Sequence, residues 1–152
     1  MIVILTLFGL AVPAAASQQV PFTATGTAVA TSTTKLPGGL TQIDGNLTGT
    51  ATHLGNVTGT VTRIQSKKGN FTTTVVLVGA NGKDSVFLAI SGSFESSSGS
   101  CVLTSTGTYS VTGGTGAFAN ATGGGTIITE FDQCAGAATG TYTGTISQPN
   151  SG

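Results

Sequence analysis

The segment CVLTSTGTYSVT, residues 101–112, decides the fold class because its side chains alternate strictly between two kinds. One set is mostly apolar or small: Leu103, Ser105, Gly107, Tyr109 and Val111. The other set contains only hydroxyl side chains: Thr104, Thr106, Thr108, Ser110 and Thr112. Alternation with a period of two predicts a β-strand with one packed face and one solvated face.

The same alternation recurs along the chain, and no stretch has convincing helical spacing. It predicts eight strands, at residues 21–31, 40–52, 56–64, 70–79, 84–95, 101–112, 124–133 and 138–147. Gly, Ser, Asn and Pro fill the connections, and Asn81-Gly82 is the strongest hairpin signal. We therefore expect an all-β fold, an eight-stranded antiparallel β-barrel, because closure hides every sheet edge. A two-sheet β-sandwich satisfies the same pattern.

The composition bounds the size and the class of the protein. The chain has 152 residues, of which 38% are hydrophobic, and this allows one domain with a modest core. Only 7% of residues are charged, the net charge is zero, and no basic run is longer than Lys67-Lys68. A nucleic-acid partner is therefore not expected. The sequence predicts no cofactor.

The first residues, MIVILTLFGLAVPAAAS, are typical of a signal peptide. An apolar run from Ile2 to Val12 precedes small residues at Ala14 and Ala16, although no Lys or Arg precedes the run. We expect cleavage after Ala16, so that residues 1–16 are the signal peptide and residues 17–152 a single barrel domain. The run is shorter than the roughly 20 residues of a membrane span, so the mature protein is expected to be secreted or periplasmic, with no integral membrane segment.

The chain has two cysteines, Cys101 and Cys134. In an exported protein such a pair is more often a disulfide than a metal site, and two buried free thiols are the alternative. A hairpin folded symmetrically about Ala117 and Phe118 would place Val111 opposite Gly124 and Cys101 opposite Cys134. The disulfide would then join two neighbouring strands.

That register affects two carboxylates, Glu130 and Asp132. If Cys134 lies on the packed face, strict alternation carries both carboxylates into the barrel, where they would form an acid pair suited to acid–base chemistry. If a bulge near Gln133 resets the register, Phe131 and Ile127 face inward and the carboxylates face water. The second alternative is favoured because burying two unpaired carboxylates is costly.

Four further residues are candidates for ligand binding: His53, Arg63, Tyr109 and Tyr142. An inward Arg63 near a barrel mouth would bind a carboxylate, although an arginine at a strand end also reaches solvent easily. His53 is the only histidine and is expected to hydrogen-bond a loop at the rim. A lone histidine predicts no metal site, and no catalytic residues can be assigned.

Four asparagines begin sequons for N-glycosylation: Asn46, Asn56, Asn70 and Asn120. They are possible acceptors if the source organism glycosylates exported proteins.

Three segments carry a resemblance to a known family. VTGGTGAFANATGGG (Val111–Gly125) resembles a glycine-rich turn of the allene oxide cyclase and dirigent barrels. ATHLGNVTG (Ala51–Gly59) and GANGKDSVF (Gly79–Phe87) resemble uncharacterised secreted microbial relatives of those barrels, which tend to carry a basic residue where this chain has Ala117 and Asn56 and which lack a counterpart of Lys83. The resemblance implies the barrel rather than the sandwich, and it transfers no functional residue. The turn lacks the features of a phosphate loop, so we expect Phe118 to plug one barrel end.

Three classes of function follow from these observations. The first is non-enzymatic binding of a small apolar or carboxylate-bearing ligand, or of a partner surface. The second, implied by the resemblance, is a cyclase-like or dirigent-like enzyme that steers a reactive intermediate in the barrel pocket. The third is recognition of ice, mineral or polysaccharide by threonine rows on a strand face. Whether the chain forms oligomers is not predicted.

Overall fold

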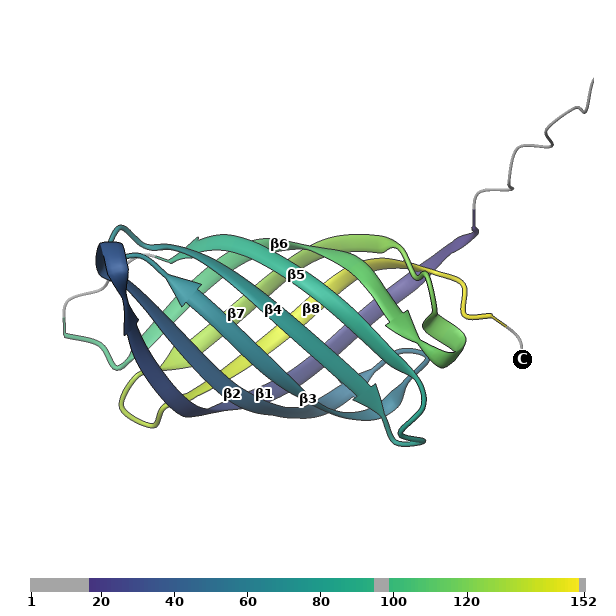
Figure 1. Cartoon of the computed structure of the whole chain (residues 1–152), viewed down its shortest axis with the longest axis horizontal. Helices are drawn as coiled ribbons and strands as arrows, with labels where there is room; N and C mark the ends of the chain where they lie inside the picture. The colour runs from purple at the N-terminus through teal and green to yellow at the C-terminus, as the bar shows by residue number, and fades with distance from the viewer. Residues whose placement is uncertain (1–16, 95–98, 151–152) are drawn as a thin grey trace, which may run out of the picture.

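The alternating segments form strands that close into one antiparallel barrel, as a computed structural model of residues 17–94 and 99–150 shows (Figure 1). The strands are β1 (Gln19–Leu36), β2 (Leu40–Ala51), β3 (Gly55–Gln65), β4 (Asn70–Gly79), β5 (Ser85–Phe94), β6 (Val102–Thr115), β7 (Gly123–Asp132) and β8 (Ala137–Ser147). Two short 3-10 turns, Pro37–Gly39 and Gly116–Phe118, are the helical elements of these residues. None of the helices described is long and apolar enough to cross a membrane.

Each strand pairs with its neighbour in sequence, and β1 closes the barrel on β8. The closing register runs from Gln19 opposite Ser147 to Val29 opposite Ala137. This closure confirms the predicted barrel and excludes the sandwich. The first strand is longer than predicted, because β1 continues beyond β8 to Leu36 and pairs there with β2 alone.

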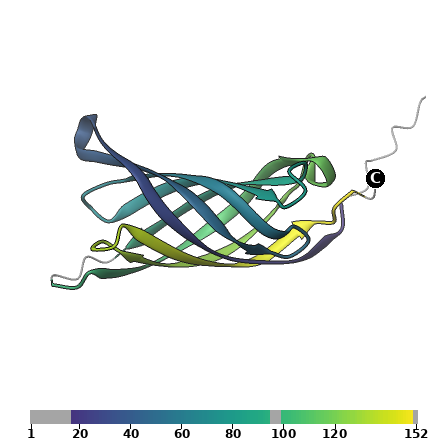
Figure 2. The ribbon, with the colours of Figure 1, turned by 90° about the horizontal axis from the view of Figure 1, so that it is seen from below.

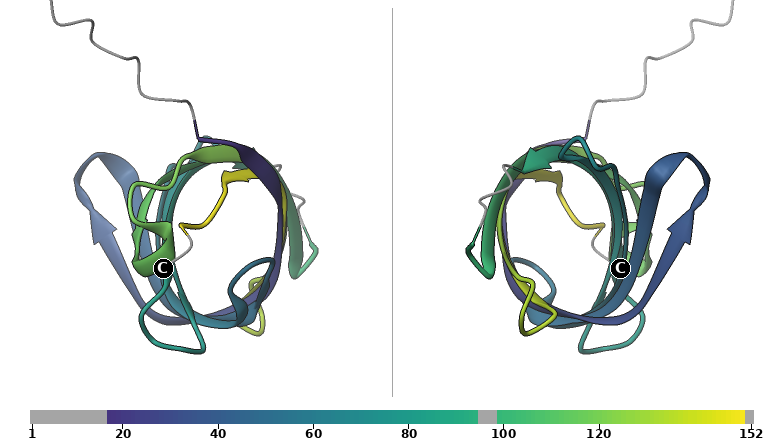
Figure 3. Two further views of the ribbon diagram at one scale, coloured as in Figure 1. Left: turned by 90° about the vertical axis from the view of Figure 1, so that its right-hand side faces the viewer. Right: turned by 90° about the vertical axis from the view of Figure 1, so that its left-hand side faces the viewer.

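The glycine-rich turn between β6 and β7 lies at one end of the barrel (Figure 3). Large side chains of the core close this end. Phe22, Val86, Phe118 and Ile146 are fully or almost fully buried there. The chain after β8 crosses the same end, since the Asn150 amide donates to the Ala117 carbonyl at 2.8 Å. Phe118 is therefore buried at the end that its turn closes, as predicted.

Tyr109 points into the barrel interior, and the two residues that follow it across the neighbouring strands are glycines, Gly125 and Gly144. It pairs with Gly125 on β7, and Gly125 pairs with Gly144 on β8. A Cβ atom on Gly144 would lie 2.6 Å from the Tyr109 hydroxyl oxygen, so any larger residue would displace the ring. Glycine at position 144 gives the aromatic side chain its room, whereas a Cβ atom on Gly125 would meet the backbone of β8 at Thr143 and Gly144.

The predicted register of the β6–β7 hairpin is wrong by one residue. Val111 pairs with Gly123, not Gly124, because a single 3-10 turn places an odd number of residues between the two strands. Cys101 consequently falls opposite Gln133, whose amide donates to the Cys101 carbonyl at 2.8 Å. Cys134 lies one residue further on, in the β7–β8 turn, and still forms the predicted disulfide, with a Cα–Cα distance of 5.4 Å.

Candidate functional site

A cavity of about 90 Å³ lies inside the barrel toward the end that carries the β1–β2 hairpin. Its wall is largely aliphatic and aromatic, and includes Ile43, Leu47, Val61, Phe71, Val75, Ile90, Ile127 and Phe131. Small residues of β1 and β8, Gly26, Ala28, Ala138 and Gly140, leave the space open. The alternation of each strand produces this arrangement, because the residues of one parity all face inward.

Arg63 on β3 is the one charged residue among those that line the cavity. It is half-buried, and its guanidinium carbon lies 3.9 Å from the centre of the Phe71 ring and 5.4 Å from that of Phe94. Its Nε has no hydrogen-bond partner in the part of the chain described. Burial lowers the pKa of Arg63 to about 10, so the group remains cationic at neutral pH. The Arg63 cation thus faces the cavity and lies beside the aromatic rings of Phe71 and Phe94.

The other polar groups on the cavity wall are neutral. Gln65 and Thr73 come from β3 and β4, and Thr129 comes from β7. These three residues and the two rings around Arg63 were not among the predicted site residues. A signal was available, since Phe71 and Thr73 share the parity of the apolar residues Val75 and Leu77 in the same strand.

Tyr142 lines the cavity and Tyr109 lies beside it. Their rings meet nearly edge to face, with centroids 5.7 Å apart, and the Tyr109 ring also contacts Phe22 at 6.2 Å. Burial, with a smaller contribution from Tyr109, raises the pKa of Tyr142 to about 12, and burial also raises the pKa of Tyr109. Both phenols are therefore neutral at physiological pH, and the buried Tyr109 hydroxyl has no partner among the described residues.

His53 lies far from the cavity, in the β2–β3 turn at the closed end. It has a positive φ of 66° and an exposed side chain, and its Nε2 lies 3.2 Å from the Pro21 carbonyl oxygen. This is the rim position expected of it, with β1 rather than a loop as the partner. The structure does not bring His53 together with Arg63 or the tyrosines.

Glu130 and Asp132 face away from the cavity, whereas Ile127, Thr129 and Phe131 line it. The predicted bulge near Gln133 is wrong, because the β6–β7 register runs without a shift to Asp132. The one-residue change of register alone keeps both carboxylates outside. Asp132 accepts hydrogen bonds from the Cys134 and Ala135 amides at 2.9 and 3.0 Å, so it orders the β7–β8 turn.

Cys101, Asp132 and Cys134 lie close enough together to suggest a metal site, but the two sulfurs are bonded to each other. The group is therefore a disulfide beside a turn-capping carboxylate. The four sequon asparagines, Asn46, Asn56, Asn70 and Asn120, are all exposed.

The closed antiparallel barrel has a dirigent-like fold, the fold that the three sequence segments suggested. The solved structure of the dirigent protein GePTS1, a pterocarpan synthase, is similar, with a TM-score of 0.53 over 95% of this chain and 99% of that one. The two sequences are only 16% identical, so the likeness concerns the fold. No family model matches the chain, and neither does any curated protein.

Proposed function

We propose that this chain is an exported, non-enzymatic barrel that binds a small, mostly apolar acid, with the acid group at Arg63. The observation that carries the proposal is the Arg63 cation, which faces an apolar cavity without an acidic neighbour on the cavity wall. Arg63 has no carboxylate counterion among the described residues, which is unfavourable for a half-buried charge, and an anionic ligand would supply a partner. The planar guanidinium suits a carboxylate, which it can bind through two hydrogen bonds.

The size of the cavity limits what can enter it. An apolar cavity of about 150 Å³ takes up benzene, so the smaller 90 Å³ here suits a short alkyl chain, or a single ring that stays partly in the mouth, rather than a long lipid. The rest of a larger ligand would remain at the mouth. Sugars are poor candidates, because Gln65, Thr73 and Thr129 are few partners for so many hydroxyl groups.

Binding without chemistry is favoured because the described residues of the wall offer no general base. Arg63 and Tyr142 are the titratable groups among the cavity-lining residues, and both hold their protons at neutral pH. The second candidate is a dirigent-like protein that steers a reactive intermediate, and the likeness to a pterocarpan synthase dirigent protein favours it. A dirigent-like protein of this kind would act through the shape of its pocket more than through acid–base groups. Recognition of flat surfaces by threonine rows is disfavoured, since the rows lie on a curved barrel (Figure 3).

Export is part of the proposal. The disulfide supports it, because such bonds persist mainly in oxidising compartments. The predicted signal peptide, residues 1–16, lies outside the described residues.

Thermal shift with a panel of small acids tests the binding proposal. A ligand at a hundred times its Kd adds about 2.7 kcal/mol of stability, which raises Tm by roughly 10 °C for a domain of this size. Aromatic and short-chain carboxylic acids should stabilise the protein, their methyl esters less so, and Arg63→Met should remove the difference. If the acids stabilise Arg63→Met as well as the wild type, or stabilise neither, the proposed site is wrong.

Gly140→Ala is a matched test of the cavity. A Cβ atom there would lie 3.4 Å from Cε2 of Tyr142 and 3.7 Å from Cδ1 of Ile127, which are ordinary contacts. The variant should therefore fold normally and bind bulky acids less well, while small acids still reach Arg63. Equal loss for all acids would point to a disturbed barrel instead.

A further inference from the structure

The β1–β2 hairpin stands clear of the barrel wall at the end nearest the cavity (Figures 2 and 3). β1 leaves β8 after Val29 and continues with β2 alone, and its register shifts between Ala30 and Ser32. Side chains 31–35 are all exposed. The Pro37–Gly39 turn at the tip has open space around Gly38. The hairpin is therefore a projecting element that packs little against the rest of the molecule.

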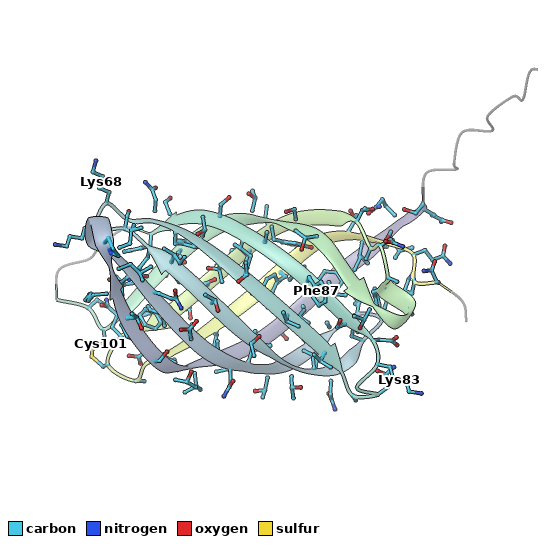
Figure 4. All side chains as sticks on the ribbon, in the orientation of Figure 1. Lys68, Lys83, Phe87 and Cys101 are labelled. Atoms are coloured by element: carbon cyan, nitrogen blue, oxygen red, sulfur yellow. A yellow bond between two sulfur atoms is a disulfide. The ribbon has the colours of Figure 1, made fainter. Side chains whose placement is uncertain are left out.

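Basic side chains gather at this projection. Of the five lysines and arginines in the chain, Lys35 lies on the hairpin and Lys67 and Lys68 lie in the β3–β4 turn beside it (Figure 4). Lys67 reaches the tip, since its Cε lies 3.8 Å from where a Cβ on Gly39 would be. Lys35 donates to the Thr41 hydroxyl at 3.0 Å rather than to a carboxylate. Lys83 lies at the opposite end of the barrel (Figure 4).

Among residues 17–94 and 99–150, the acidic groups near this end do not neutralise the projection. Asp44, at the base of the hairpin, accepts hydrogen bonds from Gln42, Thr62 and Ser32. Glu130 and Asp132 belong to β7, which β8 separates from the hairpin. The lysines flank two partly exposed leucines, Leu36 and Leu40, which pair across the tip.

We propose that this basic hairpin face (Lys35, Leu36, Leu40, Lys67 and Lys68) docks on the surface of a lipid bilayer that carries anionic headgroups. Lysines attract such a surface, and the leucines add apolar contact at its boundary. Docking goes beyond ligand binding, because it uses residues outside the cavity. It would bring the cavity end to the place where small apolar acids concentrate, and lipid is therefore favoured over a soluble polyanion.

Co-sedimentation of the ligand-free mature protein with vesicles tests the proposal. Vesicles of equal parts phosphatidylcholine and phosphatidylglycerol should bind the protein, and vesicles of phosphatidylcholine alone should bind it far less. Each lysine near an anionic surface strengthens binding roughly fivefold, so replacing Lys35, Lys67 and Lys68 with Gln should weaken it roughly a hundredfold. Lys83→Gln is the matched control, with the same loss of charge at the other end, and should bind as the wild type does.

A fluorescent probe reports the docking geometry without depending on affinity. The chain has no tryptophan, so Pro37→Trp places a single one at the exposed tip. Its emission should shift to the blue on anionic vesicles, whereas that of Ala80→Trp, in the exposed β4–β5 turn, should not.

Three results would overturn the proposal: equal binding to both kinds of vesicle, unchanged binding of the triple Gln variant, or binding to soluble dextran sulfate without binding to vesicles. The Arg63 site can fail separately, because the thermal shift assay contains no vesicles and the vesicle assay contains no acid.

Discussion

At the residue scale, Phe118 is the clearest example of a side chain whose role follows from its burial. The ring is only 2% exposed and fills the end of the barrel. Phe118→Ala should lower the free energy of unfolding by about 3 kcal/mol or more, because truncating a buried aromatic ring leaves a cavity. Chemical denaturation measures this change. A loss of less than half that size would mean that the turn collapses onto the gap.

The hydroxyl of Tyr109 should contribute nothing favourable to stability. It is buried without a hydrogen-bond partner in the described structure, and an unsatisfied polar group costs free energy. Tyr109→Phe should leave the free energy of unfolding unchanged or raise it by about 1 kcal/mol, whereas Tyr109→Leu should lower it because ring contacts are lost. A clear decrease for Tyr109→Phe would reveal a partner for the hydroxyl.

The two tyrosines also predict a dependence on alkaline pH. Burial raises the pKa of Tyr142 to about 12, above the value of about 10 for an unfolded chain. The folded state therefore holds this proton more tightly, and the stability that it contributes is lost as pH rises from about 10 to about 12. Burial lowers the pKa of Arg63 to about 10 and acts in the opposite direction, so the comparison is with Tyr142→Phe.

Tyrosinate absorbance measures this titration directly, because the chain has only two tyrosines and no tryptophan. The native protein should show little tyrosinate at pH 10, and the unfolded protein should show about half of its full signal. Ionisation of one tyrosine at pH 10 in the native state would contradict the burial of that ring.

At the element scale, the β6–β7 hairpin shows what sequence can and cannot predict. Alternation identified both strands and the inward residues of β6, such as Tyr109, because parity depends only on the period of the strand. For β7 it left both faces open, and Ile127 was favoured as inward only because burying two carboxylates is costly. The register depended on the shape of the glycine turn, and the 3-10 turn at Gly116–Phe118 changed it by one residue. Arg63 was predicted as a candidate because the side to which it points depends only on its own strand. Its contacts with the Phe71 and Phe94 rings were missed, since they depend on how three strands align.

The disulfide joins the chain before β6 to the β7–β8 turn, and it should contribute a large share of the free energy of unfolding. It closes a separation of 33 residues, and the chain-entropy estimate for such a loop is about 3 to 4 kcal/mol. A variant with both cysteines replaced by Ala should lose about that much free energy of unfolding, and the wild type should contain no titratable thiol. An unchanged stability would mean that the hairpin alone holds the two turns together.

At the scale of the whole molecule, the position of the apolar and polar side chains was predictable and the cavity was not. The barrel followed from eight alternating strands, since closure removes the exposed edges of a sheet. The open space depends on where small residues such as Gly26 and Gly140 lie side by side on neighbouring strands, and this requires the register of every pair. The long β1–β2 hairpin was missed because its outer part alternates poorly and pairs on one side only.

The order of the strands also makes the closing seam between β1 and β8 the most demanding step of folding. Seven of the eight pairings join neighbours in sequence, whereas this one joins segments more than a hundred residues apart and must overcome the loop-closure entropy of nearly the whole domain. The start of β1 and the end of β8 meet there, since the Gln148 amide donates to the Gln18 carbonyl at 2.7 Å. A circular permutant that links these ends and opens the chain at the Pro37–Gly39 turn would convert the distant pairing into a local hairpin and so fold faster to the same barrel.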